Sequence, residues 1–285
     1  MTSQAVRPNA GEPDIIVLRD PEACAATAAE RIAAALREPI LERGLAHWAT
    51  TGGTTPAPIY RRLATPPLRD KVKWTAVELW WSDERFVPRD HPLSNAKVAA
   101  DSLLEIAWLA GESGTGGSGA DIAGRRAPGA PIPAVNVHPI PAAEAIAEGQ
   151  GPDWAATRYA EMLRDSGPPV EGGWPVFDLI LLGVGPDGHI MSVFPGSAAF
   201  DSKDWAIGVP APTHVEPHVA RITLNPQILA VARQIVLVSQ GESKAGVLAS
   251  VLGGEREPRR WPAQLARRSG AVWILDEAAA AQLPR

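Results

Sequence analysis

The sequence predicts an α/β fold with a single open, mostly parallel sheet flanked by helices on both faces. Short apolar or β-branched runs alternate along the chain with longer stretches rich in Ala, Leu and Arg, the pattern of repeated strand–helix units. The strongest strand, residues 177–184, is apolar almost throughout, as expected where helices cover both faces of a sheet. The chain has 285 residues, 45% of them hydrophobic, and can bury a large core.

The first third of the chain begins with a strand at residues 15–18 and an Ala-rich helix from about 22 to 36. We expect Pro39 to end or kink this helix, because proline lacks the N–H group that a helix interior uses. A strand near 45–49 then leads through the turn 51–55 into a short helix.

The middle of the chain is expected to hold a strand at 77–81 that runs into a polar segment at 82–85. Ser94 or Asn95 can cap a helix that reaches about Trp108, because either side chain can accept a hydrogen bond from a free helical N–H. The later elements are a helix with its buried face at Ala155, Tyr159, Met162 and Leu163, strands at 221–224, 234–239 and 271–275, and a helix at 242–252.

Although this length would also suit two small domains, we assign residues 14–285 to one domain, preceded by a flexible N-terminus at 1–13. Residues 111–133 are dominated by Gly, Ala, Ser and Pro and contain few large apolar side chains. We interpret them as a mobile surface insertion.

Composition excludes several classes of protein. The net charge of −5 and pI near 5.7 provide no basic field for nucleic acid or an acidic membrane surface. Cys24 is the only cysteine, so internal disulfides are excluded. The N-terminal segment lacks a signal-peptide pattern, and apolar runs such as 179–182 are far too short for a membrane span. We expect a cytoplasmic monomer or small homo-oligomer.

A Thr-Gly-Gly-Thr-Thr-Pro motif at 51–56 is the first candidate for chemistry. Gly52 and Gly53 let the backbone approach an anion, while the Thr54 and Thr55 hydroxyls and the first helical amides can donate to phosphate. The same pattern also suits a tight turn with a threonine cap. The motif lacks the lysine of a Walker-type loop, which argues against a nucleoside triphosphate.

Two further strand ends carry cations. Arg85, preceded by the acidic pair Asp83 and Glu84, offers a planar fork suited to phosphate, although a charged segment is often a solvated loop. Lys244 lies in a Gly-Glu-Ser-Lys turn and could supply a point charge or remain a surface lysine.

The run 183–188 matches the Gly-x-Gly-x-x-Gly dinucleotide pattern. That interpretation requires a long helix next, which Pro195 interrupts, so a nicotinamide cofactor is disfavoured. His189 follows directly and shares the strand end with Asp187. It is either an oriented general base or a structural histidine.

His214 and His218, with Glu216 between them, faintly resemble a metal site. Pro217 prevents a regular helix from presenting both imidazoles on one face, and no third ligand is evident nearby. We expect no metal.

In order and spacing these clusters resemble the 6-phosphogluconolactonase family over nearly the whole chain. Any one motif is weak, but five in register are specific. At the first motif the family often has Ser-Gly-Gly-Ser-Thr-Pro, and Thr51 and Thr54 keep the hydroxyls here. The motifs are TGGTTP at 51–56, WSDERFVP at 81–88 with Ser94 and Asn95, LGVGPDGH at 182–189 with SVFPGS at 192–197, RITL at 221–224 and GESK at 241–244.

The resemblance implies hydrolysis of 6-phospho-D-glucono-1,5-lactone to 6-phosphogluconate in the pentose phosphate pathway, without metal or cofactor. His189 would activate water, and Asp187 would hold the imidazole tautomer or contact a sugar hydroxyl. The implied substrate-binding residues are Gly52, Gly53, Thr54, Thr55, Asp83, Arg85, Arg221 and Lys244.

Glucosamine-6-phosphate deaminases and isomerases share this fold group and are the nearest alternative. They typically follow Asp-Gly-His with a Phe-Asn-Glu-type segment, whose Glu supports ring opening, and they have Asp-Glu-Tyr where this chain has Asp-Glu-Arg85. The segment 192–195 here is Ser-Val-Phe-Pro. Both differences favour the lactonase. A non-enzymatic sugar-phosphate-binding module ranks third, because no helix-turn-helix segment or basic domain is attached.

Overall fold

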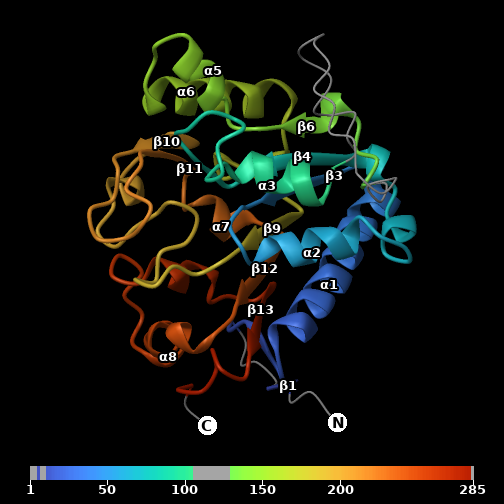
Figure 1. Cartoon of the computed structure of the whole chain (residues 1–285), viewed down its shortest axis with the longest axis vertical. Coiled ribbons are helices and arrows are strands. Elements are labelled where there is room, and N and C mark those ends of the chain that lie inside the picture. The colour runs from blue at the N-terminus through green and yellow to red at the C-terminus, as the bar shows by residue number, and fades with distance from the viewer. Residues whose placement is uncertain (1–4, 7–10, 105–128, 284–285) are drawn as a thin grey trace, which may run out of the picture.

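The computed structural model describes residues 5–6, 11–104 and 129–283, and Figure 1 shows them arranged around a central sheet. Seven parallel strands and one antiparallel edge strand form this sheet, which confirms the predicted α/β class. In spatial order the strands are β1 (Ala5–Val6), β2 (Asp14–Leu18), β13 (Ala271–Asp276), β12 (Gln234–Ser239), β9 (Leu179–Leu182), β3 (Ala46–Thr50), β4 (Val77–Trp81) and β6 (Val137–His138).

The strand order reverses between β3 and β9, which are neighbours in the sheet. From β3 the chain continues outward to β4 and β6, whereas from β9 it continues the other way to β12 and β13. The loops after β3 and β9 therefore diverge and leave a crevice at the carboxyl ends of these strands. Open α/β sheets bind their ligands at such a point.

The chain also forms a second, smaller sheet. Its order is β10 (Ala206–Val209), β11 (Arg221–Leu224) and β5 (Asp83–Arg85), all antiparallel. The chain leaves the main sheet at Ser82, whose carbonyl accepts a hydrogen bond from the Leu224 amide at 2.8 Å. This cross-link between distant segments has no local sequence signal. A separate hairpin joins β7 (Val170–Glu171) to β8 (Trp174–Pro175).

Helices cover both faces of the main sheet. Figure 1 places α1 and α8 on opposite sides of β13, while α5 and α6 lie at the other end of the molecule beside β10. The helices are α1 (Pro21–Arg43), α2 (Pro56–Leu63), α3 (Asn95–Ser102), α5 (Ala142–Ala147), α6 (Pro152–Ser166), α7 (Ile228–Val231) and α8 (Ala245–Gly253). Short 3₁₀ turns occupy Arg69–Lys71, Trp74–Ala76, Ala134–Asn136, Ala198–Phe200, Glu242–Lys244 and Pro262–Ala266.

The long helix α1 is longer than the sequence predicted. Asp20 caps its start by accepting a hydrogen bond from the Ala23 amide at 2.8 Å. The prediction that Pro39 ends the helix is wrong, because the helix continues to Arg43 and stops at Gly44 in a left-handed conformation. Pro39 is buried within a helix that packs along several strands, and this packing offsets the lost backbone hydrogen bond.

Most other predicted elements are confirmed with shifted ends. Ser94, not Asn95, caps α3 and accepts a hydrogen bond from the Lys97 amide. The helix ends at Ser102, before the predicted Trp108, and residues 105–108 lie outside the described residues. Ala155, Tyr159 and Leu163 are buried along α6 and Met162 is partly buried, as their spacing predicted. The expected strand 177–184 is confined to β9, and the expected helix 242–252 begins with a 3₁₀ turn before α8.

Aromatic side chains fill the core beneath the crevice. Trp48, Trp80, Trp81 and Trp273 are fully buried. The Tyr159 hydroxyl accepts a hydrogen bond from the Trp81 amide at 2.8 Å and donates to the Trp81 carbonyl at 2.9 Å, which attaches α6 to β4. The strand ends above this core are thereby held in fixed positions.

The two segments expected to be mobile are only partly described. Of 111–133, residues 111–128 lie outside the described residues, but Ala130 is fully buried and its amide donates to the Leu103 carbonyl at 2.7 Å. The end of this segment therefore packs into the core.

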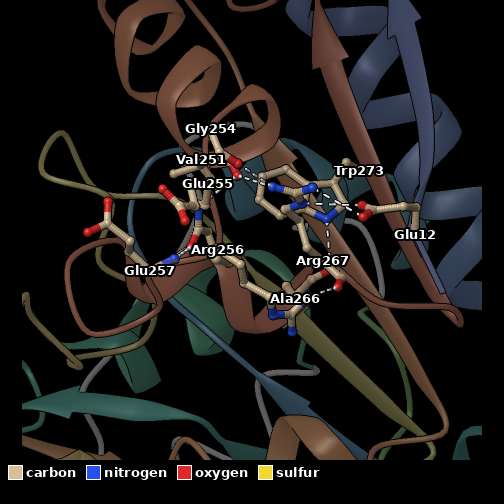
Figure 2. Close-up of polar contacts among 10 residues, drawn as sticks. Glu12, Val251, Gly254, Glu255, Arg256, Glu257, Ala266, Arg267 and Trp273 are labelled. Atoms are coloured by element: carbon tan, nitrogen blue, oxygen red, sulfur yellow. Dashed lines mark hydrogen bonds and ion pairs between the residues drawn. The ribbon is translucent and has the colours of Figure 1, made fainter.

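Of the expected flexible N-terminus, the described part is attached to the fold. Ala5–Val6 pair with β2, and Figure 2 shows Glu12 beside the guanidinium of Arg267 at 3.1 and 3.2 Å. Arg267 also donates to the carbonyls of Val251 and Gly254 at the end of α8. This arginine joins three distant segments, which a local sequence pattern does not indicate.

None of the helices in the described ranges is long and apolar enough to cross a membrane.

Candidate active site

A cavity of about 440 Å³ lies in the crevice where the strand order reverses. The loops after β3, β9 and β12 contribute to its lining, together with side chains of β5 and β11. Nine of the ten residues proposed from the sequence line it: Gly52, Gly53, Thr54, Thr55, Asp83, Arg85, His189, Arg221 and Lys244. The tenth, Asp187, is not among the lining residues and forms a hydrogen bond to His189.

The turn after β3 brings backbone close to neighbouring atoms, as its glycines suggested. A Cβ atom at Gly52 would lie 2.1 Å from Asn95 Oδ1 and 2.6 Å from Asn95 Cα, so no other residue fits there. Gly53 has a φ of +95°, which favours glycine. Thr55 precedes α2 but makes no capping hydrogen bond with its side chain. The threonine-cap interpretation is therefore wrong. Because Pro56 and Pro58 have no N–H, Ala57 supplies the first helical amide of α2 that can bind an anion.

Asp83 organises the loops around the cavity. Its carboxylate accepts hydrogen bonds from Ser192 Oγ at 2.8 Å, Asn95 Nδ2 at 3.0 Å and Thr51 Oγ1 at 3.3 Å. The residue is only 3% exposed. A carboxylate has no hydrogen to donate to a phosphate, so these contacts favour a positioning role for Asp83 over the substrate contact expected from the sequence.

Glu84 caps α3 from the neighbouring strand. Its carboxylate accepts hydrogen bonds from the amides of Asn95 at 2.7 Å, Ala96 at 2.9 Å and Arg85 at 2.7 Å, and from Ser94 Oγ at 3.1 Å. Burial raises the pKa of Glu84 to about 7, although the amide hydrogen bonds oppose this shift. The free energy of unfolding should therefore depend on the ionisation of this carboxyl.

Because the pKa of Glu84 is higher in the folded than in the unfolded chain, protonation of Glu84 favours folding. Its contribution is complete below about pH 4.5 and is lost as the pH rises to about 7. Urea unfolding at pH 4.5 and 7.5 should show that the wild-type chain loses up to about 3 kcal/mol more than Glu84→Gln over this interval. Equal pH dependence in the two proteins would contradict a raised pKa.

Arg85 and Arg221 are direct cross-strand partners of β5 and β11. Arg221 is 2% exposed and donates to the Pro217 carbonyl at 2.9 Å. Arg85 donates to the Leu93 carbonyl at 2.8 Å, while its buried Nε has no hydrogen-bond partner among the described residues. Burial, followed by the charge of Arg85, lowers the pKa of Arg221. Two guanidinium groups facing each other repel, and a bound dianion would relieve that repulsion.

His189 lies against the turn that follows β9. Its Nδ1 is 2.5 Å from Asp187 Oδ1, and its ring is tilted against Phe194 with centroids 4.6 Å apart. A Cβ atom at Gly185 would lie 2.0 Å from His189 Nδ1, so glycine is needed for this ring position. The Gly-x-Gly-x-x-Gly run 183–188 is followed by this turn and not by a helix, which excludes the dinucleotide geometry.

The carboxylate of Asp187 bonds to two imidazoles. Its Oδ2 lies 2.9 Å from Nε2 of His214, in addition to the contact with His189. Burial alone would raise the pKa of Asp187, but the hydrogen bonds and charge from the histidines outweigh it and lower that pKa far below its usual range. Asp187 is therefore ionised, so each imidazole donates an N–H to it. This leaves Nε2 of His189 without that proton and able to accept one.

Lys244 follows β12 and reaches the same cavity. Its Nζ donates to the Val184 carbonyl at 2.8 Å. Burial lowers the pKa of Lys244, and the negative charge of Asp187 opposes this shift. The turn before it depends on Gly241, which has a φ of +89° and whose amide donates to the Asp276 carboxylate at 3.0 and 3.1 Å.

Several lining residues were not selected from the sequence. Met191 is the non-glycine residue with positive φ, at 54°, among those described, a strained conformation of the kind found at functional sites. Val215 and Glu216 also line the cavity.

His214 was considered from the sequence only as a weak metal ligand, and in the structure it instead forms a hydrogen bond with Asp187. Within the described ranges, no three His, Cys, Asp or Glu side chains are grouped as a metal site.

Known proteins resemble this chain along nearly its whole length. A family model described as glucosamine-6-phosphate isomerases/6-phosphogluconolactonase matches residues 19–274. A 6-phosphogluconolactonase of Streptomyces coelicolor is 33% identical over 96% of this chain and 95% of its own, and one of Synechocystis is 33% identical over 86% and 87%.

Solved structures agree. The 6-phosphogluconolactonase of Trypanosoma brucei superimposes with a TM-score of 0.76 at 26% identity, covering 96% of this chain and all of the other. The chain belongs to the glucosamine-6-phosphate isomerase/6-phosphogluconolactonase family.

Proposed function

We propose that this chain is a cytoplasmic 6-phosphogluconolactonase that hydrolyses 6-phospho-D-glucono-1,5-lactone to 6-phosphogluconate in the pentose phosphate pathway. The observation that carries the proposal is one cavity lined by His189, hydrogen-bonded to the ionised Asp187, and by the arginine pair Arg85 and Arg221. The substrate carries a phosphate dianion at one end, which suits the arginine pair, and an activated ester at the other, which suits His189.

The phosphate would bind to the arginine pair and to the turn Gly52–Thr55, whose amides and hydroxyls can donate to its oxygens. Lys244 would add a positive charge. Fixing the phosphate positions the lactone carbonyl and turns a bimolecular encounter into an oriented attack. Asp83 would act indirectly, by holding the loops that carry these groups.

His189 would act as the general base. Its Nε2 would take a proton from water while the water oxygen attacks C1 of the lactone, and the imidazolium would then return a proton to the departing ring oxygen. The C1–O bond to the ring breaks, the acid product loses its proton to solvent, and His189 returns to its neutral form. Asp187 would fix the tautomer and stabilise the imidazolium.

The deaminase or isomerase alternative is less well supported. Phe194 packs against His189 with ring centroids 4.6 Å apart, in the segment where the deaminase pattern has a glutamate. An apolar ring cannot exchange a proton with the imidazole or a sugar hydroxyl. A lactone needs only one base that acts and then returns its proton, and His189 can supply it.

A direct assay separates the possible functions. Purified protein would be offered fresh phosphogluconolactone and, separately, glucosamine 6-phosphate, with acid release and ammonia release as readouts. We expect acid release above the spontaneous rate and no ammonia. Ammonia release would establish the deaminase alternative, and binding of either compound without turnover would indicate a sugar-phosphate-binding module.

A further inference from the structure

We propose that His214 is a positioning residue that acts on the reaction through Asp187. It holds one oxygen of that carboxylate so that the other remains aligned with His189. The inference rests on the proposed function, because it assigns a role in the same hydrolysis.

The geometry consists of one carboxylate between two imidazoles. Asp187 Oδ1 is 2.5 Å from Nδ1 of His189 and also accepts a hydrogen bond from the His189 amide at 3.2 Å. Asp187 Oδ2 is 2.9 Å from Nε2 of His214. Each carboxylate oxygen thus has its own imidazole partner, and the carboxyl group cannot rotate without breaking one of these contacts.

The two imidazoles also share an aromatic neighbour. The Phe194 ring lies 4.6 Å from the His189 ring and 5.8 Å from the His214 ring, measured between centroids. Phe194 therefore packs against both histidine rings. His214 comes from the segment between β10 and β11, whereas Asp187 and His189 lie in the turn after β9.

The three side chains differ in their exposed fraction, as expected if His189 and Asp187 act in the site and His214 acts from its edge. His189 and Asp187 are 15% and 16% exposed, whereas His214 is 52% exposed. His214 is not among the residues lining the catalytic cavity, so it is not placed to contact the substrate. Its polar contact with the site passes through Asp187.

The chemical consequence follows from the tautomer of His189. Nδ1 must carry the proton that bonds to Asp187 so that Nε2 can accept the proton of water. If Asp187 rotates, the imidazole loses its fixed orientation and the fraction of correctly aligned base falls. Substrate binding would remain, because neither Asp187 nor His214 is among the side chains that line the cavity. Loss of His214 should therefore lower kcat and leave KM nearly unchanged.

His218 supplies a matched control on the same segment. It is 48% exposed, bonds to the Pro212 carbonyl through Nδ1 at 2.7 Å and pairs with Glu216, and within the described ranges it forms no hydrogen bond or ion pair with Asp187. A general disturbance of this segment should affect variants of either histidine. An effect through Asp187 should appear only for His214.

The experiment measures kcat and KM for phosphogluconolactone with His214→Phe, His214→Gln and His218→Phe. Phenylalanine keeps the ring volume but removes the donor, and we expect kcat to fall by about 3- to 10-fold with KM within about 2-fold. Glutamine offers an N–H near the position of Nε2 and should restore most of kcat. His218→Phe should keep the wild-type kcat.

A double variant tests the route of the effect. In an Asp187→Asn background, adding His214→Phe should cause no further loss of kcat, because the contact on which His214 acts is already changed. Wild-type kcat in His214→Phe, an equal loss in His218→Phe, or an additive loss in the double variant would each overturn the inference. If the wild-type chain itself hydrolyses no lactone, the proposed function fails instead.

Discussion

Replacing His189 with alanine is expected to lower kcat for lactone hydrolysis near neutral pH by at least about 100-fold, because general base catalysis typically contributes about 10²–10⁴-fold. Nε2 of His189 is the proton acceptor that the pairing with Asp187 leaves available in the cavity. Binding of 6-phosphogluconate should change little, because the proposed phosphate contacts lie on other loops. Acid release, corrected for spontaneous hydrolysis, and calorimetric titration of the product would measure the two effects.

The same measurements on His218→Ala provide the control, since this histidine is outside the lining of the cavity. A His189→Ala protein with near-normal turnover would remove His189 from the mechanism. Equal loss of turnover and product binding would indicate that the substitution had disturbed the fold of the cavity rather than the proton transfer.

Replacing Arg85 with alanine should raise KM for the lactone by about 10- to 100-fold, the range expected for losing a charge-assisted contact to a phosphate. The effect should be large because Arg85 faces Arg221 directly across the two strands, and its buried Nε has no hydrogen-bond partner among the described residues. Inhibition by inorganic phosphate should weaken in parallel. Steady-state kinetics with phosphate as competitor would measure both.

Arg85→Lys tests the geometry of the contact. Lysine keeps the charge but lacks the planar fork, so its KM should lie between those of the wild type and Arg85→Ala. Arg259→Ala is a suitable control, because Arg259 is exposed and pairs with Asp201 away from the cavity. An unchanged KM in Arg85→Ala would reject the phosphate role of this residue.

The local parts of the site were predictable because they depend on short stretches of chain. Gly53 and Gly185 each lie three residues after a strand of the main sheet. Gly53 is favoured by its positive φ, and Gly185 by the close approach of His189, four residues along the chain. Asp187 and His189 are two positions apart, so their contact was suggested by the sequence itself. The parallel sheet followed from the alternation of apolar runs and helical stretches.

The sequence by itself determined the α/β class, most of the strands and the residues that gather at their ends. Only the tertiary structure decided that Arg85 faces Arg221, that Asp83 joins three loops and that His214 shares Asp187 with His189. Such contacts join segments far apart in the chain, and they depend on strand order and on a second sheet that no periodicity encodes. Hydrophobic patterning specifies which residues are buried in each element, whereas the pairing of distant elements is selected by the packing of the whole chain.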